Sequence, residues 1–231
     1  MLLRSSHEGF PRTDTKRVAP LIAIMGPVSV QIAFVMELTL VPILLPSIQA
    51  DFGLSLRQVA WVFNAYSTAM AVGILACATG GDRLKSSKVF GFGVLFFLAG
   101  SVLIYAVTSN EVLLAGRVLQ GFGAGLFSPL IPVLLTQASP DRPGRTLILW
   151  GSTAGYVAAL APLACGFFLT DENWNLAFLL IAMVAVVAVL SLLVTHSPLE
   201  TTPPANRQKP FSPLLEAPQL WLTLGYASTT Y

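Results

Sequence analysis

One acidic side chain stands alone in a long apolar stretch near the start of the chain. Between Val18 and Ala50, Glu37 is the only charged residue. If this stretch lies in a membrane, an ionised carboxylate there costs on the order of 2.5–3.5 kcal/mol, and burial disfavours its charged form. Such a carboxyl group can load a proton from one side and release it to the other, or bind a cationic substrate in exchange. The alternative is a Glu37 that reaches water near the outer interface or pairs with Arg117.

Other polar residues in the apolar stretches offer little chemistry beyond this carboxyl group. Four are candidates to line a cavity, although uncharged polar groups also bond simply between helices: Gln31, Thr39, Asn64 and Tyr66. The two histidines, His7 and His196, complete no catalytic triad or metal site. Cys77 and Cys165 lack metal-ligand spacing, so we interpret both as small packing residues. We therefore expect no enzyme activity and no cofactor.

The apolar stretches themselves predict an integral membrane protein. Only 10% of the residues are charged, against about a quarter in a soluble domain. A bilayer core about 30 Å thick requires about 20 helical residues, and each uncharged run is long enough. Membrane strands would alternate in polarity, which these runs do not. We predict an all-α membrane fold with six transmembrane helices, near residues 20–48, 58–79, 89–109, 112–136, 146–169 and 174–195.

The distribution of basic residues predicts the orientation of these helices. Arg57 is the only cation in the loops of one side, which otherwise carry Asp51, Glu111, Asp171 and Glu172. The positive-inside rule places the opposite side, with the N-terminus, in the cytoplasm, and we expect the plasma membrane. This asymmetry explains the small positive net charge, so no nucleic-acid partner is expected. The cations of the cytoplasmic side are Arg4, Arg12, Lys16, Arg17, Arg83, Lys85, Lys88, Arg142, Arg145, Arg207 and Lys209.

The remaining segments flank the predicted bundle. Residues 1–17 are expected to form a cytoplasmic tail, and residues 18–196 the six-helix bundle. The proline-rich residues 197–218 are interpreted as a cytoplasmic linker. Residues 219–231 begin another apolar segment that reaches about 20 Å as a helix, too short to cross a bilayer. We interpret it as the truncated start of a seventh transmembrane helix, and we expect a C-terminal half or partner half to be missing.

The loop between the second and third predicted helices carries a recognisable motif. Residues 78–88 read ATGGDRLKSSK. This resembles the signature loop of the major facilitator superfamily, in which a Gly-rich helix end is followed by Asp-Arg, a Gly and basic residues. Asp82 and Arg83 match and Lys88 keeps a basic charge, whereas Lys85 stands where the family usually has Gly. The resemblance implies that Asp82, Arg83 and Lys88 form a conformational latch; the alternative is an ordinary cytoplasmic loop.

The fourth predicted helix carries a second motif of the same family. Residues 117–125 read RVLQGFGAG, similar to the family pattern Arg-x-x-Gln-Gly-x-Gly-Ala. The resemblance implies that Arg117 faces a polar cavity and helps to move a proton; alternatively, its side chain extends outward to water. We assign Gln120 to helix packing, together with a small-residue face for close helix approach made by Gly121, Gly123 and Gly125.

The fifth predicted helix contains Ala161-Pro162-Leu163-Ala164-Cys165-Gly166. Exporters of this superfamily carry a Gly-Pro-x-x-Gly-Gly element here, of which Pro162 and Gly166 are retained. The resemblance implies an element that biases the direction of transport. Proline in a membrane helix also permits a bend, so a simple packing kink is the alternative.

The first predicted helix places Glu37 inside a third motif. Residues 36–46, MELTLVPILLP, resemble the acid-x-Thr-x-Val pattern, ending in Leu-Pro, of the multidrug branch. Glu37 replaces the Asp common there. Further similarity lies at Trp61 and Tyr66 and at residues 174–178, so the resemblance spans about residues 20–195.

Taken together, the resemblance implies a proton-coupled exporter of amphipathic small molecules that works by alternating access between two six-helix bundles. Its expected partners are a small-molecule substrate, protons, the lipid bilayer and the second bundle. One alternative is an importer, or an exporter of a specific metabolite or siderophore. Another is a non-transporting membrane partner or a remnant derived from a transporter.

Overall fold

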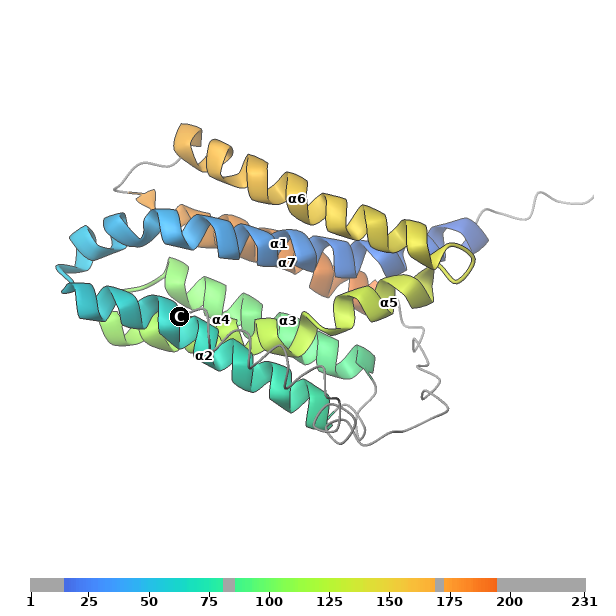
Figure 1. Ribbon diagram of the computed structural model, residues 1–231, viewed down its shortest axis with the longest axis horizontal. Coiled ribbons are helices and arrows are strands. Elements are labelled where there is room, and N and C mark those ends of the chain that lie inside the picture. Colours follow the sequence, from blue (N-terminus) through green and yellow to red (C-terminus); the bar gives the residue numbers. More distant parts are fainter. Residues whose placement is uncertain (1–14, 81–85, 169–172, 195–231) are drawn as a thin grey trace, which may run out of the picture. The chain divides into compact units, whose positions relative to one another are not determined.

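Every element of the described chain is helical (Figure 1). The computed structural model describes residues 15–80, 86–168 and 173–194, and within these ranges it contains no strand. The predicted linker, the predicted seventh segment and most of the N-terminal tail lie outside the described residues. The helices are α1 (Thr15–Phe52), α2 (Leu56–Gly80), α3 (Ser86–Tyr105), α4 (Asn110–Phe127), α5 (Leu130–Ala138), α6 (Pro143–Phe168) and α7 (Leu176–Val194).

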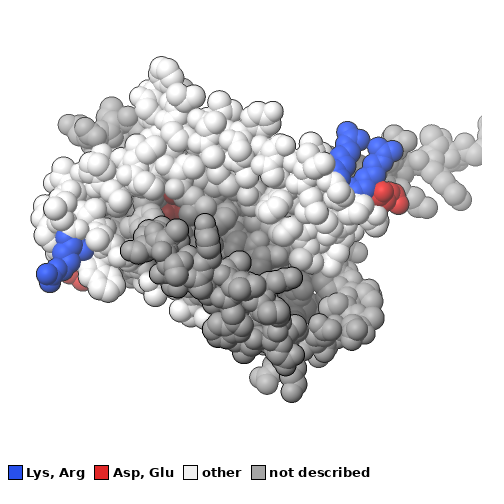
Figure 2. Space-filling model, in the orientation of Figure 1, with Lys and Arg blue, Asp and Glu red and all other residues white. Residues whose placement is uncertain are grey.

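These helices account for the predicted membrane spans. Five of them are long and apolar enough to cross a bilayer alone, and α4 with α5 make a sixth span if the bent pair counts as one. Figure 2 shows the cations and anions near the two ends of the helices, with an almost entirely uncharged belt between them on the face drawn. This distribution suits a bundle that passes through lipid, and the all-α membrane fold is confirmed.

The fourth span differs from the prediction because it is broken. A continuous helix over residues 112–136 was expected, but α4 ends at Phe127, α5 begins at Leu130, and the two axes differ by 42°. Pro129 and Pro132 lie at this break. Proline has no backbone N–H to donate and its ring clashes with the carbonyl four residues earlier, so it bends a helix.

A tight connection joins α1 to α2 and sets the two helices side by side. Gly53 adopts φ +60°, a left-handed conformation that only glycine takes without strain. Ser55 and Gln58 then cap α2 reciprocally: the Ser55 backbone N–H donates to Gln58 Oε1 over 2.9 Å, and the Gln58 N–H donates to Ser55 Oγ over 3.4 Å. The short turn brings the second half of α1 close to the first half of α2.

Helix α4 lies between α2 and α3, while α1 packs mainly against α7 and α6 (Figure 1). The ring of Phe127, at the end of α4, meets three other rings edge to face, with centroid distances of 5.4 Å to Phe97, 5.9 Å to Phe34 and 6.3 Å to Phe90. Phe127 thus joins α1, α3 and α4 in one apolar core.

The glycines of α4 allow backbone-to-backbone packing on both sides. A Cβ at Gly121 would overlap the carbonyl oxygen of Tyr66 in α2, and one at Gly125 would overlap that of Met70. A Cβ at Gly123 would instead overlap the backbone nitrogen of Phe97 in α3. The close helix approach predicted at these glycines is present, and the 100° advance per helical residue places Gly121 and Gly125 against α2 but Gly123 against α3.

Candidate functional site

The two charges predicted inside the spans meet in the interior of the bundle. Glu37 of α1 and Arg117 of α4 are each only 1% exposed, and Arg117 Nη1 donates to Glu37 Oε1 in a salt bridge. They are 80 residues apart in the sequence and are brought together by the packing of α1 and α4 within one core. A buried pair of this kind avoids the penalty of two isolated charges, provided that their remaining polar atoms are also bonded.

Gln120 completes the bonding of this pair. It lies three residues after Arg117, on the same face of α4. Its Oε1 accepts from Arg117 Nη1 over 2.8 Å, while its Nε2 donates to Glu37 Oε2 over 2.8 Å. Both carboxylate oxygens of Glu37 therefore accept a hydrogen bond. The sequence assigned Gln120 to helix packing, and the structure places it at the centre of the charged cluster.

Ser101 of α3 is a further member that the sequence analysis missed. The second amide hydrogen of Gln120 Nε2 goes to Ser101 Oγ, over 3.0 Å, and the Ser101 hydroxyl donates in turn to the Phe97 carbonyl over 2.8 Å. This arrangement fixes which end of the Gln120 amide faces Glu37, because both Nε2 hydrogens are used. The only signal in the sequence was a serine in the middle of an apolar span.

Arg117 also has partners that carry no formal charge. Its Nε donates to the Val62 carbonyl of α2 over 3.1 Å. Its Cζ lies 4.5 Å from the centre of the Tyr66 ring, within the range of a cation–π contact. The guanidinium group therefore touches a carboxylate, an amide oxygen, a backbone carbonyl and an aromatic face.

The Tyr66 hydroxyl finds no hydrogen-bond partner among the described residues. The side chain is 3% exposed, and its ring lies against Arg117. Buried hydroxyls are usually bonded, and leaving one unpaired costs about 1–3 kcal/mol. The cluster thus contains one unused buried donor beside its two charges.

The other predicted cavity liners lie outside this cluster. Gln31 is buried on α1, but among the described residues it is not bonded to Glu37 or Arg117. Thr39 Oγ1 donates to carbonyls of its own helix, at 2.9 Å from Val35 O and 3.2 Å from Met36 O. Asn64 is exposed on α2.

The remaining predicted site residues fall in three places. Asp82 and Arg83 lie outside the described residues, and Lys88 is exposed in the first turn of α3. Helix α6 continues through Pro162. A Cβ placed on Gly166 would meet nothing within 4 Å, so this glycine does not serve a close contact between the described helices.

Comparison with known proteins identifies the family of this bundle. The model of the Major Facilitator Superfamily matches residues 28–231. The chain belongs to this superfamily. The similar solved structures carry the same fold: a peptide transporter POT in complex with sulfate matches with a TM-score of 0.67 at 16% identity, over 98% of this chain and 46% of that one.

Curated relatives of this superfamily member include drug efflux and resistance proteins. The chain is 31% identical over 160 residues to the drug efflux pump JefA of Mycobacterium tuberculosis, covering 68% of this chain and 32% of that protein. The tetracenomycin C resistance and export protein of Streptomyces glaucescens is 30% identical over 160 residues, covering 69% and 30%. The methylenomycin A resistance protein of Bacillus subtilis is 28% identical over 158 residues, covering 68% and 34%. The chain thus spans about a third of the length of these relatives.

Proposed function

We propose that this chain forms the N-terminal six-helix half of a proton-coupled exporter of amphipathic small molecules. The observation that carries the proposal is the fully buried Glu37–Arg117 pair bridged by Gln120, inside helices that are built to cross a membrane. Ionisable groups at such depth are rare and usually mark ion or substrate pathways.

The geometry lets Glu37 change its charge without leaving Arg117 isolated. Protonation of the carboxylate weakens the ionic contact, but the Val62 carbonyl, the Gln120 amide oxygen and the Tyr66 ring still face the guanidinium group. Because a buried cation stripped of every partner is strongly destabilising, these contacts make a neutral Glu37 tolerable. Glu37 is then available to carry a proton or to hold a cationic substrate, while Arg117 stays in place.

Export as the direction of transport rests on the relatives and on α6. Several relatives are named as efflux, export or resistance proteins. Pro162 and Gly166 retain part of the exporter element described above. An apolar bundle with one charged cluster supports amphipathic molecules as the substrates.

Exposed faces on α2 and α6 support a second helical half as partner. Among the described residues of α6 only Cys165 is buried. On α2 the buried residues all fall on the seam that faces α4: Val62, Tyr66, Ala69, Gly73 and Cys77. The opposite face of α2 is exposed. We propose that the second half packs on these open faces and that the bundles rock about a midplane site, with Asp82, Arg83 and Lys88 as the latch.

The test is proton release driven by substrate. The full-length protein is reconstituted in vesicles, ethidium is added as an amphipathic cation, and proton movement and ethidium transport are recorded for the unmodified protein and for Glu37→Gln. We expect the variant to lose proton-coupled transport. Glu111→Gln, which removes an exposed carboxylate at the start of α4, is the matched control and is expected to leave coupling intact.

The second candidate function is a non-transporting membrane protein in which the charged cluster only fastens α1 to α4. The saturated bonding of Glu37 favours this alternative, because a group with both oxygens bonded is also a good structural lock. If Glu37→Gln keeps proton-coupled transport but lowers the melting temperature, the charged cluster has a structural role between α1 and α4 and the proton role is rejected.

A further inference from the structure

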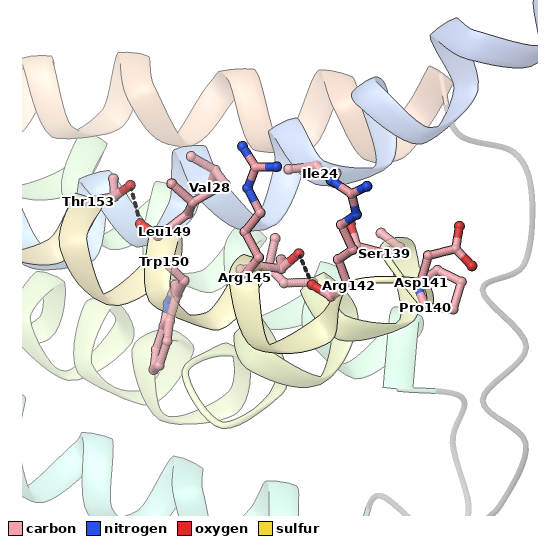
Figure 3. A pocket seen from close by; sticks show the side chains of 13 residues that line it. Ile24, Val28, Ser139, Pro140, Asp141, Arg142, Arg145, Leu149, Trp150 and Thr153 are labelled. Atoms are coloured by element: carbon pink, nitrogen blue, oxygen red, sulfur yellow. Dashed lines mark hydrogen bonds between the residues drawn. The ribbon is translucent and has the colours of Figure 1, made fainter.

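A cleft of about 650 Å³ lies between α1, α5 and α6, away from the Glu37 cluster (Figure 3). Its walls are mainly apolar, and they include Ile24 and Val28 of α1, Leu135 of α5, and Leu149 and Trp150 of α6. The charged end of the cleft is lined by Asp141 and Arg142 of the α5–α6 connection and by Arg145 of α6. An apolar trough with charges at one end fits an amphiphile better than a small polar solute.

Two arginines dominate the charged end. Arg142 directly precedes α6 and Arg145 lies in its first turn, and both side chains are exposed. Figure 3 shows the two guanidinium groups pointing in the same direction, with the Asp141 carboxylate turned to one side. Neither arginine forms a salt bridge with a described residue. Counting the described lining residues, Asp141 included, this end of the cleft keeps a net positive charge.

We propose that this cleft binds an anionic phospholipid of the cytoplasmic leaflet, with the headgroup phosphate on Arg142 and Arg145 and an acyl chain along the wall of Ile24, Val28 and Leu149. Paired guanidinium groups suit phosphate, because their planar donors match its oxygens. Basic pockets between transmembrane helices on the cytoplasmic side are typical sites for anionic headgroups. The proposal uses the orientation argued from the loop charges, but it does not depend on proton coupling.

Trp150 offers a probe of this cleft. Its indole Nε1 is buried and lacks a hydrogen-bond partner among the described residues, although the side chain lines the cleft. In Figure 3 the indole extends from α6 away from the guanidinium groups and also away from Val28 and Leu149, so it lies apart from the charged end of the cleft. Because the Trp150 side chain lines the cleft, quenching of its fluorescence by a brominated acyl chain reports whether lipid occupies the cleft.

The experiment measures quenching of Trp150 by brominated lipids. The full-length protein is prepared with Trp150 as its only tryptophan and placed in nanodiscs of phosphatidylcholine that contain equal fractions of dibrominated phosphatidylglycerol or dibrominated phosphatidylcholine. We expect stronger quenching by the anionic lipid. Replacing both arginines, as Arg142→Gln with Arg145→Gln, is expected to weaken phosphatidylglycerol binding about 30-fold, from the usual contribution of a basic residue at an anionic surface.

Controls separate this site from general attraction to an anionic membrane. Arg57→Gln removes one exposed cation at the start of α2 and should leave the preference for phosphatidylglycerol unchanged. If the single-tryptophan protein folds poorly, retention of phosphatidylglycerol by the otherwise unmodified protein is measured by native mass spectrometry with the same arginine variants. Three outcomes would each overturn the proposal. They are equal quenching by both lipids, a preference for phosphatidylglycerol that survives the double replacement, and quenching by neither lipid because a protein segment fills the cleft. Loss of ethidium transport alone would bear on the proposed function and not on this site.

Discussion

Gln120 Nε2 donates to Glu37 Oε2 over 2.8 Å and links α4 to α1 beside their salt bridge. The same amide accepts from Arg117 through its oxygen and donates to Ser101 through its second hydrogen. One neutral side chain therefore contacts both charges of the site and a third helix. Because Gln120 satisfies groups of opposite sign at once, it stabilises the pair in a way that neither an acid nor a base could.

Replacement of Gln120 tests this bridging role. Gln120→Ala leaves Glu37 and Arg117 each short of one hydrogen bond, and hydrogen bonds to charged groups are worth about 1.5–3 kcal/mol. We expect a clearly lower melting temperature for the full-length protein in detergent. Gln137→Ala is the matched control, since Gln137 is exposed on α5. Equal melting temperatures for the two variants would argue against the bridge.

Mutations of the two members of the ion pair are expected to lower the stability unequally. Glu37→Gln leaves Arg117 with the Val62 carbonyl, the Gln120 amide oxygen and the Tyr66 ring. Arg117→Met leaves the Glu37 carboxylate with only the Gln120 amide among the partners seen here, and breaking a buried pair in this way costs about 3–5 kcal/mol.

Thermal unfolding of the two single variants and the double variant measures this difference. Arg117→Met should be the less stable single variant, and adding Glu37→Gln to it should restore part of the loss. The partial rescue is the signature of direct coupling between the two side chains. Strictly additive losses would mean that the pair contributes no interaction of its own to stability.

Hydropathy and charge were enough to predict where the spans lie and which two charged residues lie inside them, but not the break in the fourth span. Lipid requires an apolar helix of a fixed minimum length, so the uncharged runs show where helices must lie. A charge inside such a run is costly, so Glu37 and Arg117 stand out in the sequence alone. Their meeting could be named only as an alternative, because contact across 80 residues depends on how α1 and α4 pack.

Neutral members of the cluster were harder to predict than the charged ones. Ser101 resembles any hydroxyl that bonds to its own helix, and in fact its hydrogen does go to the Phe97 carbonyl; only the approach of Gln120 makes it part of the site. Asn64 is exposed on α2 and lies outside the buried seam, so its place in a cavity stays a prediction. Composition reveals which groups are polar, whereas helix rotation decides which of them meet.

Glycines on α4 and α6 are expected to differ in their tolerance of alanine. Gly121→Ala would press a methyl group into the Tyr66 carbonyl oxygen, which is backbone and cannot rotate away. Helices α2 and α4 would have to separate, and overpacking of this kind typically costs about 1–3 kcal/mol. We expect reduced stability and disturbed contact between Arg117 and the Val62 carbonyl.

Gly155→Ala on α6 is the matched comparison. No atom of another described helix lies within 4 Å of the added Cβ, and alanine in a helix is favoured over glycine by about 0.5–1 kcal/mol. Within the isolated bundle the change should be neutral or slightly stabilising. A marked loss in the full-length protein would instead indicate that another helix packs directly on this face of α6, as proposed for the second half.

The unpaired hydroxyl of Tyr66 gives the last prediction. Tyr66→Phe keeps the ring beside Arg117 but removes a buried donor that has no described partner, so stability should be unchanged or higher. Tyr66→Ala loses the ring as well, and with it the cation–π contact and core packing, so it should melt at a lower temperature. If the phenylalanine variant is stable but transports ethidium poorly in vesicles, the hydroxyl binds substrate or a water during the cycle. The burial of the Tyr66 hydroxyl without a partner would then be explained by function, because a hydroxyl left unbonded in this conformation is available to bind in the next conformation of the cycle.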